Sequence, residues 1–199
     1  MLSQNSAICW KTRKYPAVLA RDLSHGSHIV DVMCSDNLSG EPDNQQGRLE
    51  AYLSGFADGE GTFSVGITRR PDLRHGFQLV PEFRVSQNSE RATVLERYQH
   101  VLGCGQIREY NARNYRDRTL VYVVRRRRDL LERVIPFFHR NPLLSEKRRS
   151  FEIFETIVTA MAAGRHRTRA GFEELVEMAF SANGDGVYRR WRLEDVIGR

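Results

Sequence analysis

The segment from Arg48 to Gly61 constrains the fold of this 199-residue chain most strongly. Its apolar residues recur at helical spacing, and a second stripe of small residues, Ala51, Gly55 and Gly59, follows the same period. A glycine inside a helix costs about 1 kcal/mol relative to alanine, so a compensating contact is expected. Small side chains let another backbone approach closely, which predicts a helix that packs tightly against a second helix. The alternative is that Gly59 and Gly61 only end the helix.

The pattern after this helix predicts an α+β fold. Polar and apolar residues alternate over 62–70 and 77–86, which indicates a hairpin of two half-buried strands. Further elements are expected as a helix over 89–102, strands over 106–110 and 119–124, and helices over 129–138, 145–164 and 172–181. Pro81 interrupts the second strand and indicates an edge or a bulge. The order αββαββα, with trailing helical residues, implies an antiparallel four-stranded sheet with helices on one face.

Three regions of the chain differ in composition. Residues 1–47 lack sustained periodicity, so we expect a poorly ordered extension and linker there. Residues 48–164 form the predicted core, and 165–199 form a basic helical tail that either docks on the core or extends a binding surface. No apolar run approaches the ~20 residues of a membrane helix. The three scattered cysteines exclude a disulfide framework. We therefore expect a cytoplasmic protein, with an organelle as the alternative.

The positive charge of the chain belongs to residues 48–199. The chain has 31 Lys and Arg against 25 Asp and Glu, a net charge of +6, and residues 48–199 hold 27 of these bases and 20 of these acids. This excess favours a polyanionic partner, most often nucleic acid, although an arginine-rich solvated surface is the alternative. Only three of the bases are lysines, and Lys147 is the one lysine within 48–199.

The polar faces of the predicted strands supply candidates for DNA recognition. Arg, Gln, Thr and Ser side chains recognise base edges in the major groove, which admits a two-stranded ribbon. An ordinary solvated sheet face is the alternative. The candidates, including two arginines of the loop between the third and fourth strands, are Ser64, Thr68, Arg70, Gln78, Glu82, Arg84, Arg108, Tyr110, Arg116 and Arg118.

A known motif resembles the end of the predicted first helix. The LAGLIDADG motif of homing endonucleases is similar to the nine residues LSGFADGEG, from Leu53 to Gly61, and its ending is likewise followed by an alternating strand. The predicted element order over about 48–164 also resembles that family. The resemblance implies a LAGLIDADG endonuclease-like core whose saddle-shaped sheet binds double-stranded DNA. It implies metal-dependent hydrolysis of phosphodiesters, with a staggered cut at a long near-palindromic target of an intron or mobile element.

The resemblance also implies roles for individual residues. Glu60 matches the acid that binds the metal, with the carbonyl of Gly59 as an additional ligand, and Mg²⁺ takes oxygen ligands of this kind. Gln87 matches a polar residue that orients the attacking water. Lys147 matches the basic residue near the active site, with Arg148 as its rival. The alternatives are a helix-capping glutamine and a solvated lysine.

The chain holds one copy of the motif, so the resemblance implies a homodimer through the 48–61 helix. The interface residues are then Ala51, Ser54, Gly55, Asp58 and Gly59, of which Asp58 is expected to cap or pair rather than to bind metal. A two-fold dimer cuts each DNA strand once. Because one fold hosts several functions, the alternatives are an RNA maturase, for which RNA is the partner, and a DNA-binding protein that does not cleave.

Overall fold

The computed structural model describes residues 42–111, 118–182 and 190–198, which lie within one compact unit, Ser39–Arg199. The elements are α1 (Pro42–Glu60), β1 (Gly61–Arg69), β2 (Phe77–Asn88), η1 (Ser89–Arg91), α2 (Thr93–Leu102), β3 (Gln106–Glu109), β4 (Thr119–Val124), α3 (Arg127–Asp129), η2 (Leu130–Val134), α4 (Ile135–Arg140), α5 (Lys147–Ala162), η3 (Arg165–Arg167), α6 (Arg169–Ser181) and α7 (Leu193–Ile197). This order confirms the predicted α+β fold. None of the described helices is both long and apolar enough to cross a membrane.

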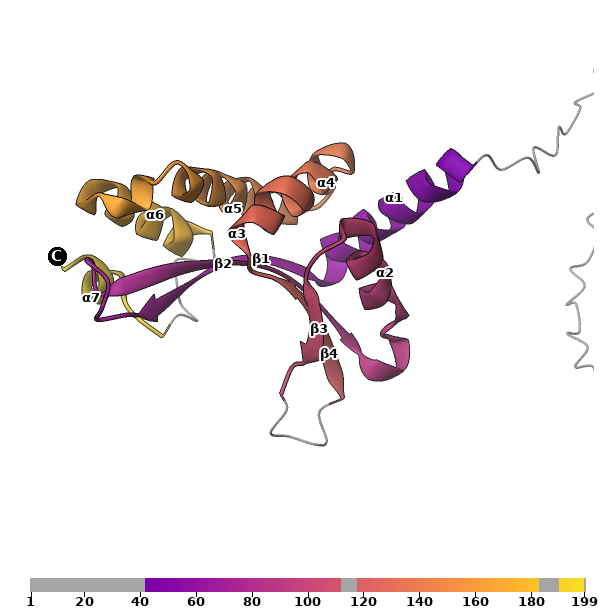
Figure 1. The fold of residues 1–199 in the computed structure, drawn as a ribbon, viewed down its shortest axis with the longest axis horizontal. Coiled ribbons are helices and arrows are strands. Elements are labelled where there is room, and N and C mark those ends of the chain that lie inside the picture. Colours follow the sequence, from indigo (N-terminus) through magenta and orange to yellow (C-terminus); the bar gives the residue numbers. More distant parts are fainter. Residues whose placement is uncertain (1–41, 112–117, 183–189, 199) are drawn as a thin grey trace, which may run out of the picture. The chain divides into compact units, whose positions relative to one another are not determined.

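The four strands form one antiparallel sheet in the order β1-β2-β4-β3. Strand β1 pairs with β2 from Phe77 to Val85, whereas β4 pairs with β2 only from Phe83 to Asn88. Pro81 therefore lies where β2 has a single neighbour, which is the edge position that a proline in a strand predicts. The sheet bends, so that the β1–β2 hairpin and the β3–β4 pair extend in different directions (Figure 1).

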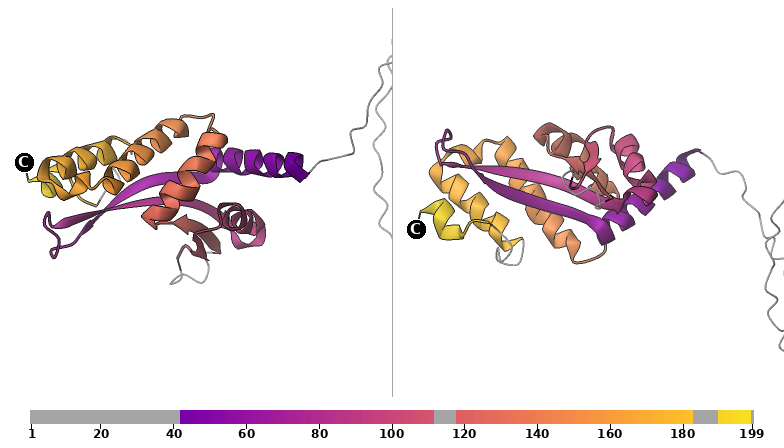
Figure 2. Two further views of the ribbon diagram at one scale, coloured as in Figure 1. Left: turned by 45° about the horizontal axis from the view of Figure 1, so that its top comes forward. Right: turned by 90° about the horizontal axis from the view of Figure 1, so that it is seen from below.

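Helices cover one face of the sheet and leave most of the other face open (Figures 1 and 2). Helix α5 packs on β1 and β2, α6 packs on β1, and α2 packs on β3 and β4. Phe63 lies near the centre of this core, because its ring centroid is 5.0 Å from those of Phe83 and Phe138 and 5.1 Å from that of Phe151. Alternate residues of each strand therefore face the helices, and the residues between them face the open side.

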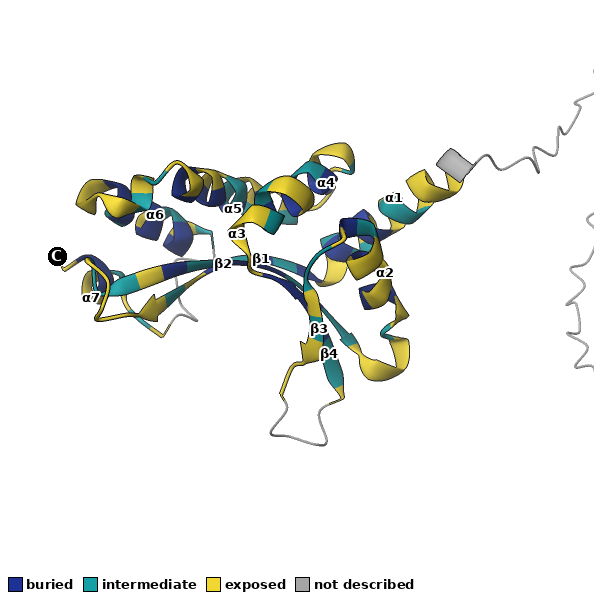
Figure 3. Ribbon diagram, viewed as in Figure 1, coloured by how far each residue is buried: buried dark blue, intermediate teal, exposed yellow. Residues whose placement is uncertain are grey.

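Helix α1 begins at Pro42 rather than near Arg48, so the expected start was wrong. The residues from Asn44 to Arg48 are all exposed (Figure 3). A helical turn that buries no side chain leaves no apolar periodicity in the sequence, which is why the pattern did not reveal it. The rest of the expected extension, residues 1–41, lies outside the described residues.

Helices α6 and α7 of the C-terminal tail dock on the core. Phe172, Leu175 and Val176 of α6 are buried in the same apolar cluster as the strands, and Val196 and Ile197 of α7 join them. Of the two alternatives left open for 165–199, docking is therefore the one observed for α6 and α7.

Candidate active site and nucleic-acid interface

Helix α1 runs into β1 without a connecting loop, and Glu60 is its last residue. The junction depends on Gly61, since a Cβ atom there would lie 2.6 Å from the carbonyl oxygen of Ala57 and 2.9 Å from its Cα atom. The Glu60 side chain is exposed, and its carboxylate forms no hydrogen bond or ion pair with a described residue. The end of α1 thus presents a carboxylate that is available to a ligand.

Hydrogen bonds fasten the loop between α4 and α5, residues 141–146, to α1. The Asp58 carboxylate accepts from the backbone N–H groups of Leu144 at 3.0 Å and Ser145 at 2.9 Å, and from the Ser145 hydroxyl at 2.5 Å. Burial alone raises the pKa of Asp58, but these hydrogen bonds and the charge of Lys147 outweigh it and hold that pKa below its usual value of 3.8. Within a single chain, Asp58 therefore holds loop 141–146 against α1.

Lys147, the first residue of α5, reaches the same end of α1. Its Nζ donates to the carbonyl oxygens of Gly59 at 2.9 Å and Ala57 at 3.2 Å. Burial lowers the pKa of Lys147 below its usual value of 10.5, although the charges of Asp58 and Glu60 act in the opposite direction. The carbonyl of Gly59, the expected second metal ligand, thus accepts a hydrogen bond from Lys147.

Arg148, the rival of Lys147 for the basic role, is engaged along its own helix. Its Nε atom donates to the carboxylate of Glu152, one turn further along α5, at 3.0 Å. Lys147 is therefore the basic side chain that lies against the end of α1.

Gln87 lies near the end of β2. It lines a cavity of about 450 Å³ together with side chains of α1 and α2, and its Oε1 atom accepts the backbone N–H of Asn88 at 2.7 Å. Within the described part of the chain, no hydrogen bond joins Gln87 to Glu60 or Lys147. The role of Gln87 in orienting the attacking water therefore stays a prediction.

The oxygen atoms at the end of α1 suit a hard divalent cation but do not enclose one. Among the described residues, no three His, Cys, Asp or Glu side chains form a group able to hold a metal ion. One chain offers the Glu60 carboxylate and the neighbouring Gly59 carbonyl. Mg²⁺ commonly binds one or two protein carboxylates and completes its shell with water and substrate phosphates. The residues therefore fit a cation that is shared with a bound phosphate.

The expected dimer residues of α1 divide into two sets. Ala51, Gly55 and Gly59 are exposed, and a Cβ atom added at either glycine would meet no atom within 4 Å. Ser54 is only 4% exposed and its hydroxyl donates to the carbonyl of Asn141 at 2.7 Å. Ser54, like Asp58, therefore contacts loop 141–146 of its own chain, whereas Ala51, Gly55 and Gly59 remain exposed.

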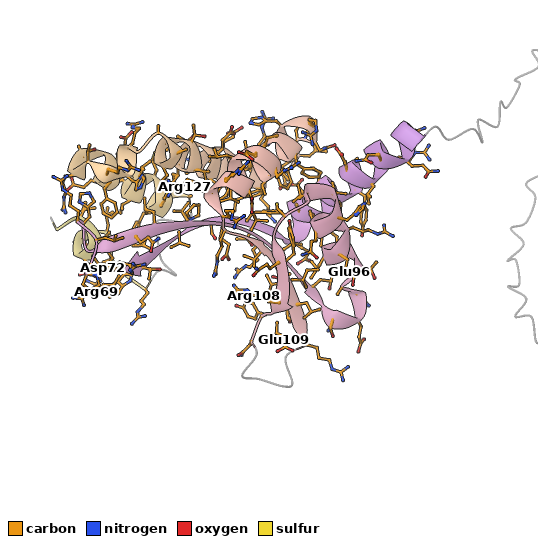
Figure 4. All side chains as sticks on the ribbon, viewed as in Figure 1. Arg69, Asp72, Glu96, Arg108, Glu109 and Arg127 are labelled. Carbon is orange, nitrogen blue, oxygen red and sulfur yellow. The ribbon has the colours of Figure 1, made fainter. Side chains whose placement is uncertain are left out.

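Most of the candidate DNA-binding residues gather on the open face of the sheet. Strand register places Ser64 opposite Glu82 and Thr68 opposite Gln78, all at positions that alternate with the core residues. The set on this face is Ser64, Thr68, Gln78, Glu82, Arg84 and Arg108, and Figure 4 shows Arg108 on this side of β3. Tyr110 lies beside them, because its ring centroid is 5.8 Å from the guanidinium carbon of Arg84.

The remaining candidates are arginines outside this set. Arg70, at the turn of the β1–β2 hairpin, forms two hydrogen bonds with Asp72 and donates to Gln78 at 3.1 Å. Arg118 pairs with Glu90 at 3.1 Å. Arg116 lies outside the described residues.

A charged network on the open face was not found by sequence reasoning. Glu82 is 8% exposed, and its carboxylate accepts a hydrogen bond from Nε of Arg125 and lies 3.9 Å from a terminal nitrogen of Arg84. The Nε atom of Arg84 is buried without a hydrogen-bond partner among the described residues. Arg125 lies two residues after Val123, so the two residues share one face of the sheet. Continuing the alternation of β4 one residue past the end of the strand would therefore have identified Arg125.

Comparisons with known proteins agree with this geometry. The family model described as LAGLIDADG endonuclease matches residues 53–158. The homing endonuclease I-ApeII of Aeropyrum pernix is 33% identical over 119 residues, which are 60% of this chain and 68% of the relative. A probable intron-encoded endonuclease 2 of Neurospora crassa is 29% identical over 174 residues, which are 87% of this chain. The chain covers only 34% of that Neurospora relative's length.

Solved structures share the fold. The archaeal intron-encoded homing endonuclease I-Vdi141I, solved in complex with DNA, superimposes with a TM-score of 0.68 at 31% identity, over 79% of this chain and 95% of that one. The homing endonuclease I-TnaI superimposes with a TM-score of 0.62 at 34% identity, over 67% of this chain and 87% of that one. Since the motif, the element order and the matched residues agree, this chain belongs to the LAGLIDADG endonuclease family.

Proposed function

We propose that this chain is a site-specific, metal-dependent endonuclease that cuts both strands of a double-stranded DNA target. The observation that carries the proposal is the exposed Glu60 carboxylate, which forms no hydrogen bond or ion pair with a described residue and lies at the helix end that Lys147 contacts. An unpaired carboxylate repels a phosphate backbone, so a protein that only binds nucleic acid gains nothing from it. The DNA-bound relative I-Vdi141I supports DNA as the substrate.

The residues at the end of α1 have complementary chemical roles. Mg²⁺ bound there would polarise a scissile phosphate and favour hydroxide formation from water. Lys147 is held by two carbonyl oxygens of α1, so its ammonium is already oriented when charge develops on the phosphate. The half-buried position strengthens that electrostatic interaction relative to bulk water.

A cut in both strands requires two such sites, and we infer that a second copy of the chain supplies the other. One chain has one motif and one Glu60. The exposed stripe of Ala51, Gly55 and Gly59 leaves room for another backbone to approach. A two-fold axis beside α1 then brings two helix ends together and matches a near-palindromic target.

Cleavage of the uninterrupted target tests the function. Full-length protein is incubated with Mg²⁺ and DNA in which the two flanks of the host intron or element are joined. The wild type is expected to give a staggered double-strand cut, whereas Glu60→Gln should bind this DNA without cutting it. Glu96→Gln, an exposed acid on α2, is the matched control and should cut normally. A wild type that binds the target but never cuts it would refute the proposal, and intact splicing by Glu60→Gln would favour a maturase.

We further infer that Glu82 positions arginines on the DNA-binding face. Its low exposure keeps it from base edges, while Arg84 and Arg125 flank its carboxylate. Glu82→Gln should lower the preference for target over random DNA about tenfold, because a misplaced arginine contact forfeits base discrimination. Affinity for random DNA should stay equal or rise, since a negative charge is lost. Equal losses on both DNAs in a binding titration would contradict the positioning role.

A further inference from the structure

Leu144 is the most exposed of the large apolar side chains in the described part of the chain. Its exposed fraction is 94%, compared with 39% for Leu73 and 51% for Tyr52. It lies in loop 141–146, between α4 and α5. A leucine that is so fully in water forgoes the stabilisation that its burial would bring, so its position calls for an explanation.

Loose structure does not explain the exposure of Leu144, because loop 141–146 is held at both ends and in the middle. Asp58 accepts the backbone N–H of Leu144 itself. At the start of the loop, the Asn141 side chain donates to Glu50 of α1 at 3.0 Å, and its carbonyl accepts the hydroxyl of Ser54 at 2.7 Å. The backbone of Leu144 is thus fixed to α1 while its side chain points away from its own core.

A cavity lies directly beside this side chain. It has a volume of about 290 Å³ and is lined by Ala51, Ser54, Gly55, Asp58, Arg140, Asn141, Pro142 and Leu144. A cavity of ~150 Å³ already admits a benzene molecule, so this one has room for a leucine side chain. The exposed small residues of α1 form one wall, where a Cβ atom on Gly55 would still meet nothing within 4 Å.

We propose that Leu144 of each copy inserts into this cavity of a second copy, so that loop 141–146 and α1 together form the dimer interface. A protruding side chain and a matching cavity on the same patch are self-complementary, which is the property that a two-fold interface requires. The lining of the cavity also carries both signs of charge, since Arg140 and Asp58 both belong to it, as suits a surface that meets its own copy. This inference rests on the proposed homodimer, and it adds loop 141–146 to α1 as the second element of the dimer interface.

The same loop connects the interface to the active site. Loop 141–146 leads directly into Lys147, which donates to the carbonyl of Gly59 next to Glu60. Insertion of Leu144 into a partner therefore places the interface directly beside the segment that positions Lys147. Weakened variants should regain cleavage at protein concentrations high enough to restore the dimer, because their own catalytic groups are unchanged.

Sedimentation equilibrium of the full-length protein tests the contact. Leu144→Ala should raise the dimer dissociation constant about a hundredfold, since each of the two leucines is worth roughly tenfold when buried. Leu144→Asp should raise it further by placing a charge in the cavity. Leu73→Ala, at the β1–β2 turn, is the matched control and should leave the constant unchanged.

Crosslinking tests which surface receives Leu144. A mixture of Leu144→Cys and Ala51→Cys proteins should form a disulfide-linked dimer under mild oxidation, whereas the wild type, which keeps its own cysteines, should not. Unchanged dimerisation of Leu144→Ala, with dimerisation lost in Gly55→Leu, would overturn this inference and leave the homodimer standing. A monomeric wild type, with Leu144 covered by another part of its own chain, would overturn both.

Discussion

The two faces of helix α1 differ in what they contact. The inner face carries Leu53 and Ala57, both fully buried in the core. The outer face carries Ala51, Gly55 and Gly59, which are exposed and border open space. Small residues thus appear on both sides, but only those on the inner side are explained by packing within one chain.

This difference shows how to interpret the glycines of α1 and of its junction with β1. At Gly61, a Cβ atom would collide with the backbone of Ala57, so the glycine is required by the fold. At Gly55, an added Cβ atom would meet nothing within 4 Å, so within the single chain glycine only weakens the helix. A residue that lowers the stability of the monomer without a structural need within it indicates a partner, which is the basis for the proposed dimer.

The largest effect on folding is expected on the inner face. Leu53→Ala should lower the free energy of unfolding by about 2–5 kcal/mol, because it removes a fully buried side chain and leaves a cavity. Denaturant titration measures the change. A loss below 1 kcal/mol would mean that the inner face of α1 is packed less closely than the structure indicates.

A smaller loss is expected for Gly61→Ala. The added methyl group must displace backbone atoms at the junction of α1 and β1, at a cost of about 1–3 kcal/mol. Thermal unfolding measures it, and an unchanged melting temperature would argue against the close approach at this junction.

The same chemical change on the outer face should have the opposite sign. Gly55→Ala should raise the free energy of unfolding of the monomer by about 1 kcal/mol, since alanine favours the helix and meets no neighbour. The measurement is made at low protein concentration, because dimerisation also stabilises the folded state. A destabilised monomer would show that Gly55 serves the fold of its own chain.

The sequence predicted the features that repeat locally. Alternation placed Ser64, Thr68 and Arg84 on the open face, and the helical period placed Leu53 in the core. The end of α1 was found because its motif is continuous in the chain. The start of α1 was not found, because its exposed first turns have no apolar face to detect.

Contacts between distant parts of the chain were beyond such patterns. Asp58 and Ser145 are 87 residues apart, and neither side chain signals the other in the sequence. The pairing of Glu82 with Arg125 depends likewise on the register of β2 against β4, which only the folded sheet defines. The sequence therefore identified the residues of the site more readily than the contacts that hold those residues in place.

Cleavage by mixed dimers tests whether each copy of the chain cuts one DNA strand. A trace of wild-type protein is mixed with an excess of Lys147→Met on supercoiled DNA that carries the target. Because the Lys147 ammonium donates to the α1 end of its own chain, each mixed dimer should retain one working site. Nicked circular DNA is expected as the main product of the mixture, whereas the wild type alone should give linear DNA. Linear DNA without a nicked product from the mixture would contradict a dimer in which each copy cuts one strand.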